Sequence, residues 1–182
     1  MTSTTLPTSG NATAREQIDD ALRWYCRGID RLDGSAVARA FHPGALLIDY
    51  GPQPMTIETF VEHAMASLGA RFTATQHRIS NTLVSFTDDG RHALVETYVL
   101  ATHVQPPEDA AGTAERLHTF AGRYVDDFSE LDGSWRITRR TLRNDWSTVE
   151  PIVERMRGPW PASGRGGSPD PLTALPADGL TR

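Results

Sequence analysis

Cysteine is almost absent from this chain of 182 residues, in which Cys26 stands alone. A lone cysteine cannot form an internal disulfide, so a disulfide-stapled scaffold is excluded and a reducing, cytoplasmic setting fits. The polar N-terminus lacks the apolar run of a secretory signal, and no stretch approaches the length of a membrane span. The formal net charge is −5, which leaves no basic footprint for nucleic acid. We therefore expect a cytoplasmic protein that binds neither nucleic acid nor membrane.

Motifs that hold cofactors or metals are also missing. There is no glycine-rich phosphate loop of the Walker or dinucleotide kind, no HExxH and no GxSxG elbow. The GRGG sequence at residues 164–167 follows no predicted strand and opens no predicted helix. The six histidines form no local cluster, although a metal site needs several converging ligands. We expect neither a metal nor an organic cofactor.

The first half of the chain carries helical patterns. Apolar residues three or four apart predict a first helix with the stripe Ile18, Leu22, Tyr25, Ile29 and Leu32. A second, shorter helix after its predicted N-cap Asp33 buries Val37, Ala40 and Phe41 and ends at residues 42–44. A short strand is predicted over residues 45–50. A third helix follows its predicted cap Thr56 and buries Ile57, Phe60, Val61, Ala64, Met65 and Leu68.

From Thr75 onward the period changes to two, which indicates strands. Four long strands are predicted at residues 77–86, 93–104, 117–131 and 135–146, followed by a helical turn within 149–156. Helices before an antiparallel meander predict an α+β fold, with the helices on one face of a curved sheet. The boundaries are a disordered segment at 1–12, one domain at 13–157 and a flexible Pro/Gly-rich tail at 158–182.

Three polar residues could carry chemistry in the first helix and the first long strand. Asp30 lies about 100° from the centre of the apolar stripe, so it flanks the buried face, and a solvated carboxylate is the alternative. Tyr25 points inward, where its hydroxyl needs a partner in either a core or a pocket. His77 shares a strand face with Ile79, Asn81 and Leu83. A few polar groups among apolar ones are typical of a ligand pocket, and a structural histidine is the alternative.

The last strand carries Arg140 on a face that is not cleanly apolar, so the residues alone allow a pocket arginine or a surface one. On the neighbouring strand Arg123, Asp126 and Asp127 predict cross-strand ion pairs. Cys26 is interpreted as a small buried apolar side chain.

Five runs occur in a meaningful order: YCRGIDRLD, FHPGA, TQHRISN, GRYVDDF and WRITRRTLRNDW. Together, over roughly residues 14–147, they resemble the SnoaL-like branch of the nuclear transport factor 2 (NTF2)-like superfamily, a cystatin-like cone. Within it the chain is similar to the bile acid 7α-dehydratase and hexachlorocyclohexane dehydrochlorinase types. The resemblance implies that Asp30 and His77 form a catalytic pair, with Tyr25 and Arg140 as supporting groups.

The resemblance implies a lyase of dehydratase type, or an isomerase, that acts on a hydrophobic ring such as a steroid, polyketide or aromatic. A positioned base needs no cofactor for such a step. The expected pocket residues are Phe41, Ile57, Phe60, Met65, Asn81 and Leu83. The alternatives are a non-catalytic ligand-binding module and the small partner subunit of a ring-hydroxylating dioxygenase. A homodimer or homotrimer is expected.

Overall fold

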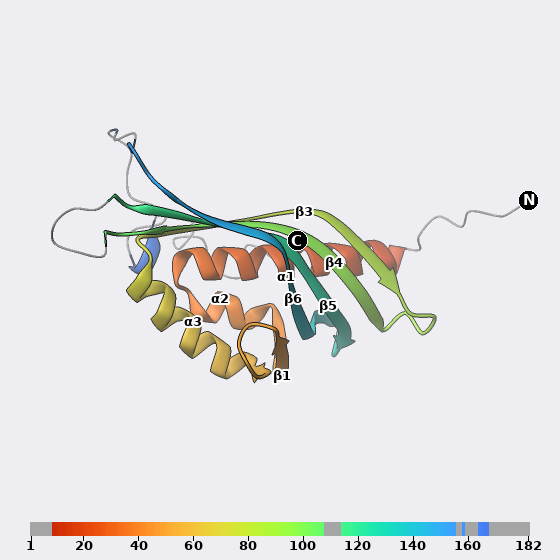
Figure 1. The fold of residues 1–182 in the computed structure, drawn as a ribbon. Coiled ribbons are helices and arrows are strands. Elements are labelled where there is room, and N and C mark those ends of the chain that lie inside the picture. The colour runs from red at the N-terminus through yellow and green to blue at the C-terminus, as the bar shows by residue number, and fades with distance from the viewer. Residues whose placement is uncertain (1–8, 108–113, 156–157, 159–163, 168–182) are drawn as a thin grey trace, which may run out of the picture.

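The computed structural model describes residues 9–107, 114–155, 158 and 164–167. Within them, three α-helices lie on one face of a six-stranded curved sheet, and Figure 1 shows the other face of the sheet without helices. The predicted α+β arrangement is therefore confirmed. None of the helices in this part of the chain is both long and apolar enough to cross a membrane. Residues 1–8 of the predicted disordered segment at 1–12 lie outside the described residues, as do residues 159–163 and 168–182 of the predicted tail at 158–182.

The sheet is a four-strand meander extended by two short strands. The strand order is β2-β1-β6-β5-β4-β3, with β1 parallel to β6 and every other pair antiparallel. The strands are β1 (Phe41–Ile48), β2 (Met55–Thr56), β3 (Ala74–Phe86), β4 (His92–Gln105), β5 (Arg116–Leu131) and β6 (Ser134–Pro151). The two-residue strand β2 was not predicted, because two residues show no alternation.

The helices are α1 (Ser9–Arg31), α2 (Gly34–Arg39) and α3 (Ile57–Arg71), and a short 3-10 turn, η1, covers Arg165–Gly167. The predicted caps are confirmed: the Asp33 carboxylate accepts a hydrogen bond from the Ala36 N–H, and the Thr56 hydroxyl accepts one from the Thr59 N–H. Helix α1 includes residues 9–12, which the sequence had assigned to the N-terminal segment.

The core fills the space between the helices and the concave face of the sheet. The stripe of α1 is buried as predicted at Ile18, Leu22, Tyr25 and Ile29, each at most 2% exposed. Cys26 is also buried, as predicted. These side chains face the inward residues of the strands, whose alternation buries every second position of β4.

Two further differences from the predicted boundaries have clear structural causes. Phe41 belongs to β1 and not to the second helix, because its strand pairs with β6 and the Ile137 N–H donates to the Ala40 carbonyl. An aromatic residue that is buried in either structure gives no periodic signal to separate them. The helical turn predicted within 149–156 is wrong for 149–151, where β6 continues in register with β5.

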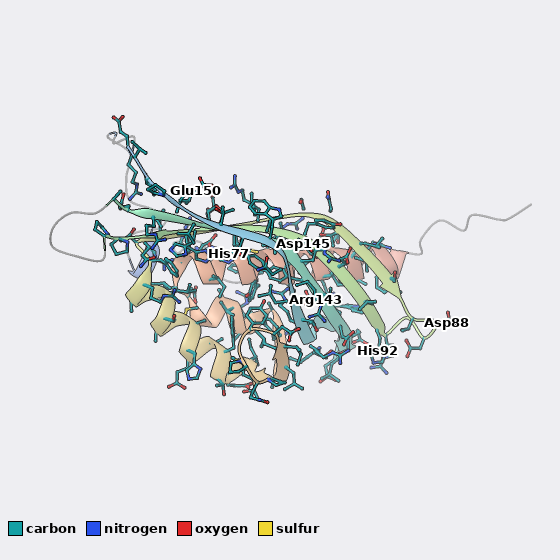
Figure 2. All side chains as sticks on the ribbon, viewed as in Figure 1. His77, Asp88, His92, Arg143, Asp145 and Glu150 are labelled. Atoms are coloured by element: carbon teal, nitrogen blue, oxygen red, sulfur yellow. The ribbon has the colours of Figure 1, made fainter. Side chains whose placement is uncertain are left out.

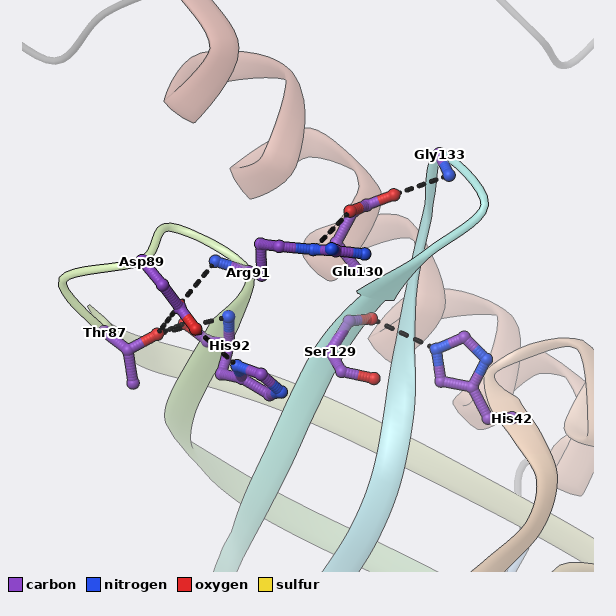
Figure 3. Close-up of polar contacts among 8 residues, drawn as sticks. All are labelled: His42, Thr87, Asp89, Arg91, His92, Ser129, Glu130 and Gly133. Atoms are coloured by element: carbon purple, nitrogen blue, oxygen red, sulfur yellow. Dashed lines mark hydrogen bonds and ion pairs between the residues drawn. The ribbon is translucent and has the colours of Figure 1, made fainter.

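The end of the sheet that carries the two tight turns is closed by polar contacts (Figure 3). Asp89 accepts hydrogen bonds from the Thr87 hydroxyl and the Arg91 N–H, and its side chain also pairs with the His92 imidazole. The His42 ring contacts the Ser129 carbonyl at 3.1 Å. Two of the six histidines therefore have structural contacts in this region.

Candidate active site

A cavity of about 540 Å3 opens between α1, α3, the loop at residues 50–52 and the concave face of the sheet. Its apolar wall is formed by Ile29, Pro52, Met55, Phe60, Ala64, Leu68, Ala101, Phe120 and Leu142. Its polar groups come from Tyr25, Tyr50, His63, Ser67, His77, His103 and Tyr124. A largely apolar wall with a few polar side chains is typical of a site for a small hydrophobic molecule.

The structure brings Asp30 and His77 together at this cavity. Asp30 lies in the last turn of α1 and His77 near the start of β3, and Figure 2 shows His77 between the sheet and the helices. One Asp30 oxygen is 2.7 Å from His77 Nδ1, and the other accepts the His77 backbone N–H at 2.9 Å. Their side chains are only 13% and 9% exposed.

This double contact fixes the orientation of the imidazole ring. A carboxylate only accepts, so Nδ1 carries the proton and donates it to Asp30, which leaves the Nε2 lone pair of neutral His77 as the acceptor. Because the backbone N–H of His77 is held as well, the strand and the ring cannot move independently. The pair can therefore accept a proton from a ligand in the cavity while the carboxylate stabilises the imidazolium.

A second histidine, His103 on β4, meets the first. Its ring lies edge-on to His77, with centroids 5.3 Å apart, and contacts Phe72 at 4.9 Å. Burial lowers the pKa of His103, and the imidazolium form of His77 would lower it further, so that the pKa is about 4 and His103 is neutral at pH 7. His103 was not among the predicted site residues, although it continues the inward-facing alternation of β4.

A pair of tyrosines forms another polar point in the cavity. The Tyr25 and Tyr50 hydroxyls are 3.3 Å apart, so one donates to the other and one hydroxyl proton remains for a ligand. Burial raises the pKa of Tyr25, against an opposing effect of Arg140, and it raises the pKa of Tyr50 well above its ordinary value. Both hydroxyls therefore stay protonated. Tyr50 was not predicted as a site residue: the sequence pattern placed it at the end of a short strand over residues 45–50, whereas β1 ends at Ile48 and Tyr50 lies just beyond it.

Arg140 is not among the residues that line the cavity. It is 0% exposed and donates two hydrogen bonds, of 2.8 and 2.6 Å, to the Asp126 carboxylate. Its guanidinium lies between the Tyr25 and Tyr124 rings, 4.2 and 4.0 Å from their centroids. Burial alone would lower the pKa of Arg140, but the charge and the hydrogen bonds of the neighbouring Asp126 carboxylate have the opposite effect. The net pKa lies well above the ordinary value. A permanent positive charge thus lies behind the tyrosine wall.

Five predicted pocket residues also lie elsewhere, whereas Phe60 lines the cavity as expected. Phe41 and Ile57 are core residues that border a different surface hollow. Met65 packs partly buried against the core from α3 without lining the cavity. Asn81 and Leu83 are both exposed.

An irregularity in β3 explains the last two positions. Ser80 pairs with Tyr98, whereas Leu83 pairs with Glu96, so β3 contains one more residue than β4 over this stretch. Asn81 adopts a left-handed backbone with φ of 48° at this bulge. An extra residue reverses the alternation, and Leu83 consequently points away from the core and is 65% exposed.

The predicted cross-strand ion pairs of β5 are present. Arg123 contacts Glu96 and Asp145, each at 3.0 Å, and Asp127 contacts Arg139 at 2.7 Å. Across the described ranges, no group of three or more His, Cys, Asp or Glu side chains is arranged to hold a metal ion.

Known proteins resemble the chain in sequence profile and in fold. The profile of the family described as SnoaL-like domain matches residues 10–141, which is more than half of the chain. No curated protein sequence matches it.

Several solved structures share the fold. A candidate scytalone dehydratase from Novosphingobium aromaticivorans has a TM-score of 0.67 at 22% identity, covering 82% of this chain and all of that one. A type 2 hexachlorocyclohexane dehydrochlorinase has a TM-score of 0.69 at 16% identity, covering 82% and 97%. A candidate aromatic ring hydroxylase from Novosphingobium aromaticivorans has a TM-score of 0.64 at 21% identity, with the same coverage. At these identities the likeness is one of fold.

Proposed function

This chain belongs to the SnoaL-like domain family, and from that premise we propose that it is a lyase of dehydratase type that acts on a hydrophobic ring substrate. The observation that carries the proposal is the Asp30–His77 hydrogen bond at the wall of an apolar cavity. A neutral imidazole with a fixed ring and a free Nε2 is a general base, and such a base typically contributes about 10²–10⁴-fold to a rate.

The reaction begins with proton transfer from carbon. His77 Nε2 takes a proton from a ring carbon next to a carbonyl group, and Asp30 stabilises the imidazolium that forms. The electron pair of the C–H bond moves onto the carbonyl oxygen, which becomes an enolate. The tyrosine of the Tyr25–Tyr50 pair whose O–H is free donates a hydrogen bond to the enolate oxygen. The positive charge of Arg140, buried behind the Tyr25 ring, stabilises the negative charge of the enolate.

The leaving group departs in the second step. The enolate re-forms the carbonyl, a carbon–carbon double bond is made, and the C–O bond of the neighbouring hydroxyl group breaks. The His77 imidazolium returns its proton to the departing oxygen, so water leaves and the imidazole is neutral again. No electrons are gained or lost overall: the proton that His77 takes from carbon leaves in the water, and the site returns to its starting state.

A bicyclic β-hydroxyketone tests the proposal. In 3-hydroxy-1-tetralone the carbonyl, the acidic carbon and the hydroxyl-bearing carbon are adjacent, and loss of water gives 1-naphthol after tautomerisation. We expect the chain to accelerate the rise in naphthol absorbance, and we expect His77→Ala to reduce the rate by about 10²–10⁴-fold. His92→Ala, which changes an exposed histidine at the start of β4, is the matched control and should keep full activity.

The same assay in D2O separates the alternatives. Incorporation of deuterium without loss of water, dependent on His77, would indicate an isomerase. If wild type and His77→Ala bind the ketone equally well and neither catalyses exchange or elimination, the proposal is wrong and a binding module is the better description.

A further inference from the structure

One described segment beyond the sheet reaches the candidate active site. The sequence GRGG at residues 164–167, which matches no phosphate-loop context, forms the 3-10 turn η1. Figure 1 shows η1 beneath the sheet, close to the C-terminal end of α3. The Arg165 side chain points back into the fold and donates three hydrogen bonds. Its acceptors are the Asp30 carbonyl at 3.0 Å, the Leu68 carbonyl at 3.0 Å and the Thr75 hydroxyl at 2.7 Å.

These acceptors belong to three elements that meet at the cavity. Asp30 is in the last turn of α1, Leu68 is in the last turn of α3, and Thr75 is in β3, two residues before His77. The last carbonyls of a helix lack intrahelical partners, and the helix end carries partial negative charge. A single guanidinium therefore bonds carbonyls at two helix C-termini, of which the Leu68 carbonyl also accepts the Phe72 N–H at 3.1 Å. Its positive charge lies where both helix dipoles favour it.

The local backbone suits this role. Gly164 and Gly166, which flank Arg165, have φ values of 68° and 63°. This left-handed region is easily adopted only by glycine, so the two glycines allow the tight turn that presents the arginine. The GRGG sequence therefore has a structural role: its glycines allow the turn, and its arginine makes three hydrogen bonds to the rest of the fold.

Both the side-chain carboxylate and the backbone carbonyl of Asp30 accept hydrogen bonds. Its carboxylate accepts both N–H groups of His77, while its carbonyl accepts Arg165. Burial lowers the pKa of Arg165 and the Asp30 carboxylate raises it, so the two charges lie close enough to interact. We propose that Arg165 is a positioning residue, which acts through Asp30 to hold the His77 imidazole in its base orientation. This rests on the proposed function, in which His77 is the base.

The spectroscopic test observes the Asp30–His77 hydrogen bond directly. The His77 Nδ1 proton should give a proton NMR signal far downfield of the amide signals, which Asp30→Asn identifies by displacing it. In Arg165→Ala we expect this signal to shift upfield and to exchange with solvent at least about tenfold faster, because a charge-assisted restraint on Asp30 is gone. Arg165→Lys should be intermediate, since one ammonium cannot span the three acceptors.

Arg155→Ala is the matched control. It removes the same charge from a nearby position whose ion pair is with Glu115, and the signal should be unchanged. Circular dichroism and urea unfolding establish that each variant is folded. If Arg165→Ala does not fold, Arg165→Lys is judged by the same shift and exchange criteria.

An unchanged signal in the folded Arg165 variant would overturn the positioning role. With the tetralone, Arg165→Ala should lower kcat with little change in KM. If His77→Ala abolishes turnover while Arg165→Ala keeps full kcat, the proposed function stands and the positioning role fails. If the wild type does not turn over the ketone, the proposed function fails, and the NMR comparison still decides whether Arg165 orients the pair.

Discussion

The pH dependence of stability should depend strongly on His103. Its folded pKa is about 4, mainly because it is buried. Arg165, and His77 and His118 in their protonated forms, lower it further, while Asp30 opposes them. In the unfolded chain its pKa returns to the ordinary value of 6.5. The unfolded state therefore binds a proton more readily, and the free energy of unfolding falls as the pH falls from about 6.5 towards 4.

The size of the effect follows from the pKa difference. A difference of about 2.5 units corresponds to about 3 kcal/mol when the pH is below both values. At pH 4.5, where folded His103 is partly protonated, the loss is about 2.5 kcal/mol relative to pH 7.5. This is a large part of the stability of a typical domain, about 5–15 kcal/mol.

Urea unfolding at pH 7.5 and pH 4.5 measures this contribution of His103 to the free energy of unfolding. His103→Gln removes it, so the variant should lose about 2.5 kcal/mol less than wild type between the two pH values. The free energy of unfolding at pH 4.5 is subtracted from that at pH 7.5 within each protein. The pH-independent loss of contacts caused by the glutamine therefore cancels. His92→Gln, at a turn and more than half exposed, should lose as much as wild type. If His103→Gln and wild type lose the same amount, His103 is not a buried neutral histidine and the reasoning is refuted.

Two other predictions concern buried groups. Arg140→Met should lower the free energy of unfolding by about 3–5 kcal/mol, because it leaves the Asp126 carboxylate buried without its partner, and the double variant with Asp126→Leu should recover much of that loss in urea titrations. A double variant no more stable than the single one would contradict this account. Burial raises the pKa of Cys26 to about 12, so iodoacetamide at pH 8 should label it only after unfolding; mass spectrometry showing labelling of the native protein at the rate of a free thiol would contradict this.

The fold was largely predictable because its signals are local. The stripe of α1, the caps Asp33 and Thr56 and the change to period two each follow from a few neighbouring residues. The element order then constrained the architecture. One error arose at Phe41, which would be buried in a helix as well as in a strand. Another arose because β6 continues past its predicted end at residue 146 and includes residues 149–151.

The candidate site was less predictable because its contacts are not local. Leu83 was misplaced by one bulge residue, which reverses every later side chain on the strand. Arg140 was expected in the pocket, and the unknown register of β5 against β6 hid its pairing with Asp126. His103 and Arg165 are 26 and 88 residues from His77 in sequence, and periodicity within one element cannot bring such residues together.

The position of Asp30 shows how a site can arise at the margin of a helical pattern. An aspartate at the centre of the stripe would be buried among apolar core side chains, which is costly for a charge that has no partner. One on the opposite face would be solvated. The flank, about 100° from the stripe, is where α1 meets β3, and there the carboxylate is mostly buried yet reaches His77 at the cavity. Tyr25 and Ile29 on the stripe line the cavity directly, whereas Asp30 on the flank reaches it through its hydrogen bond to His77. Both the apolar stripe and its polar margin therefore contribute to the pocket.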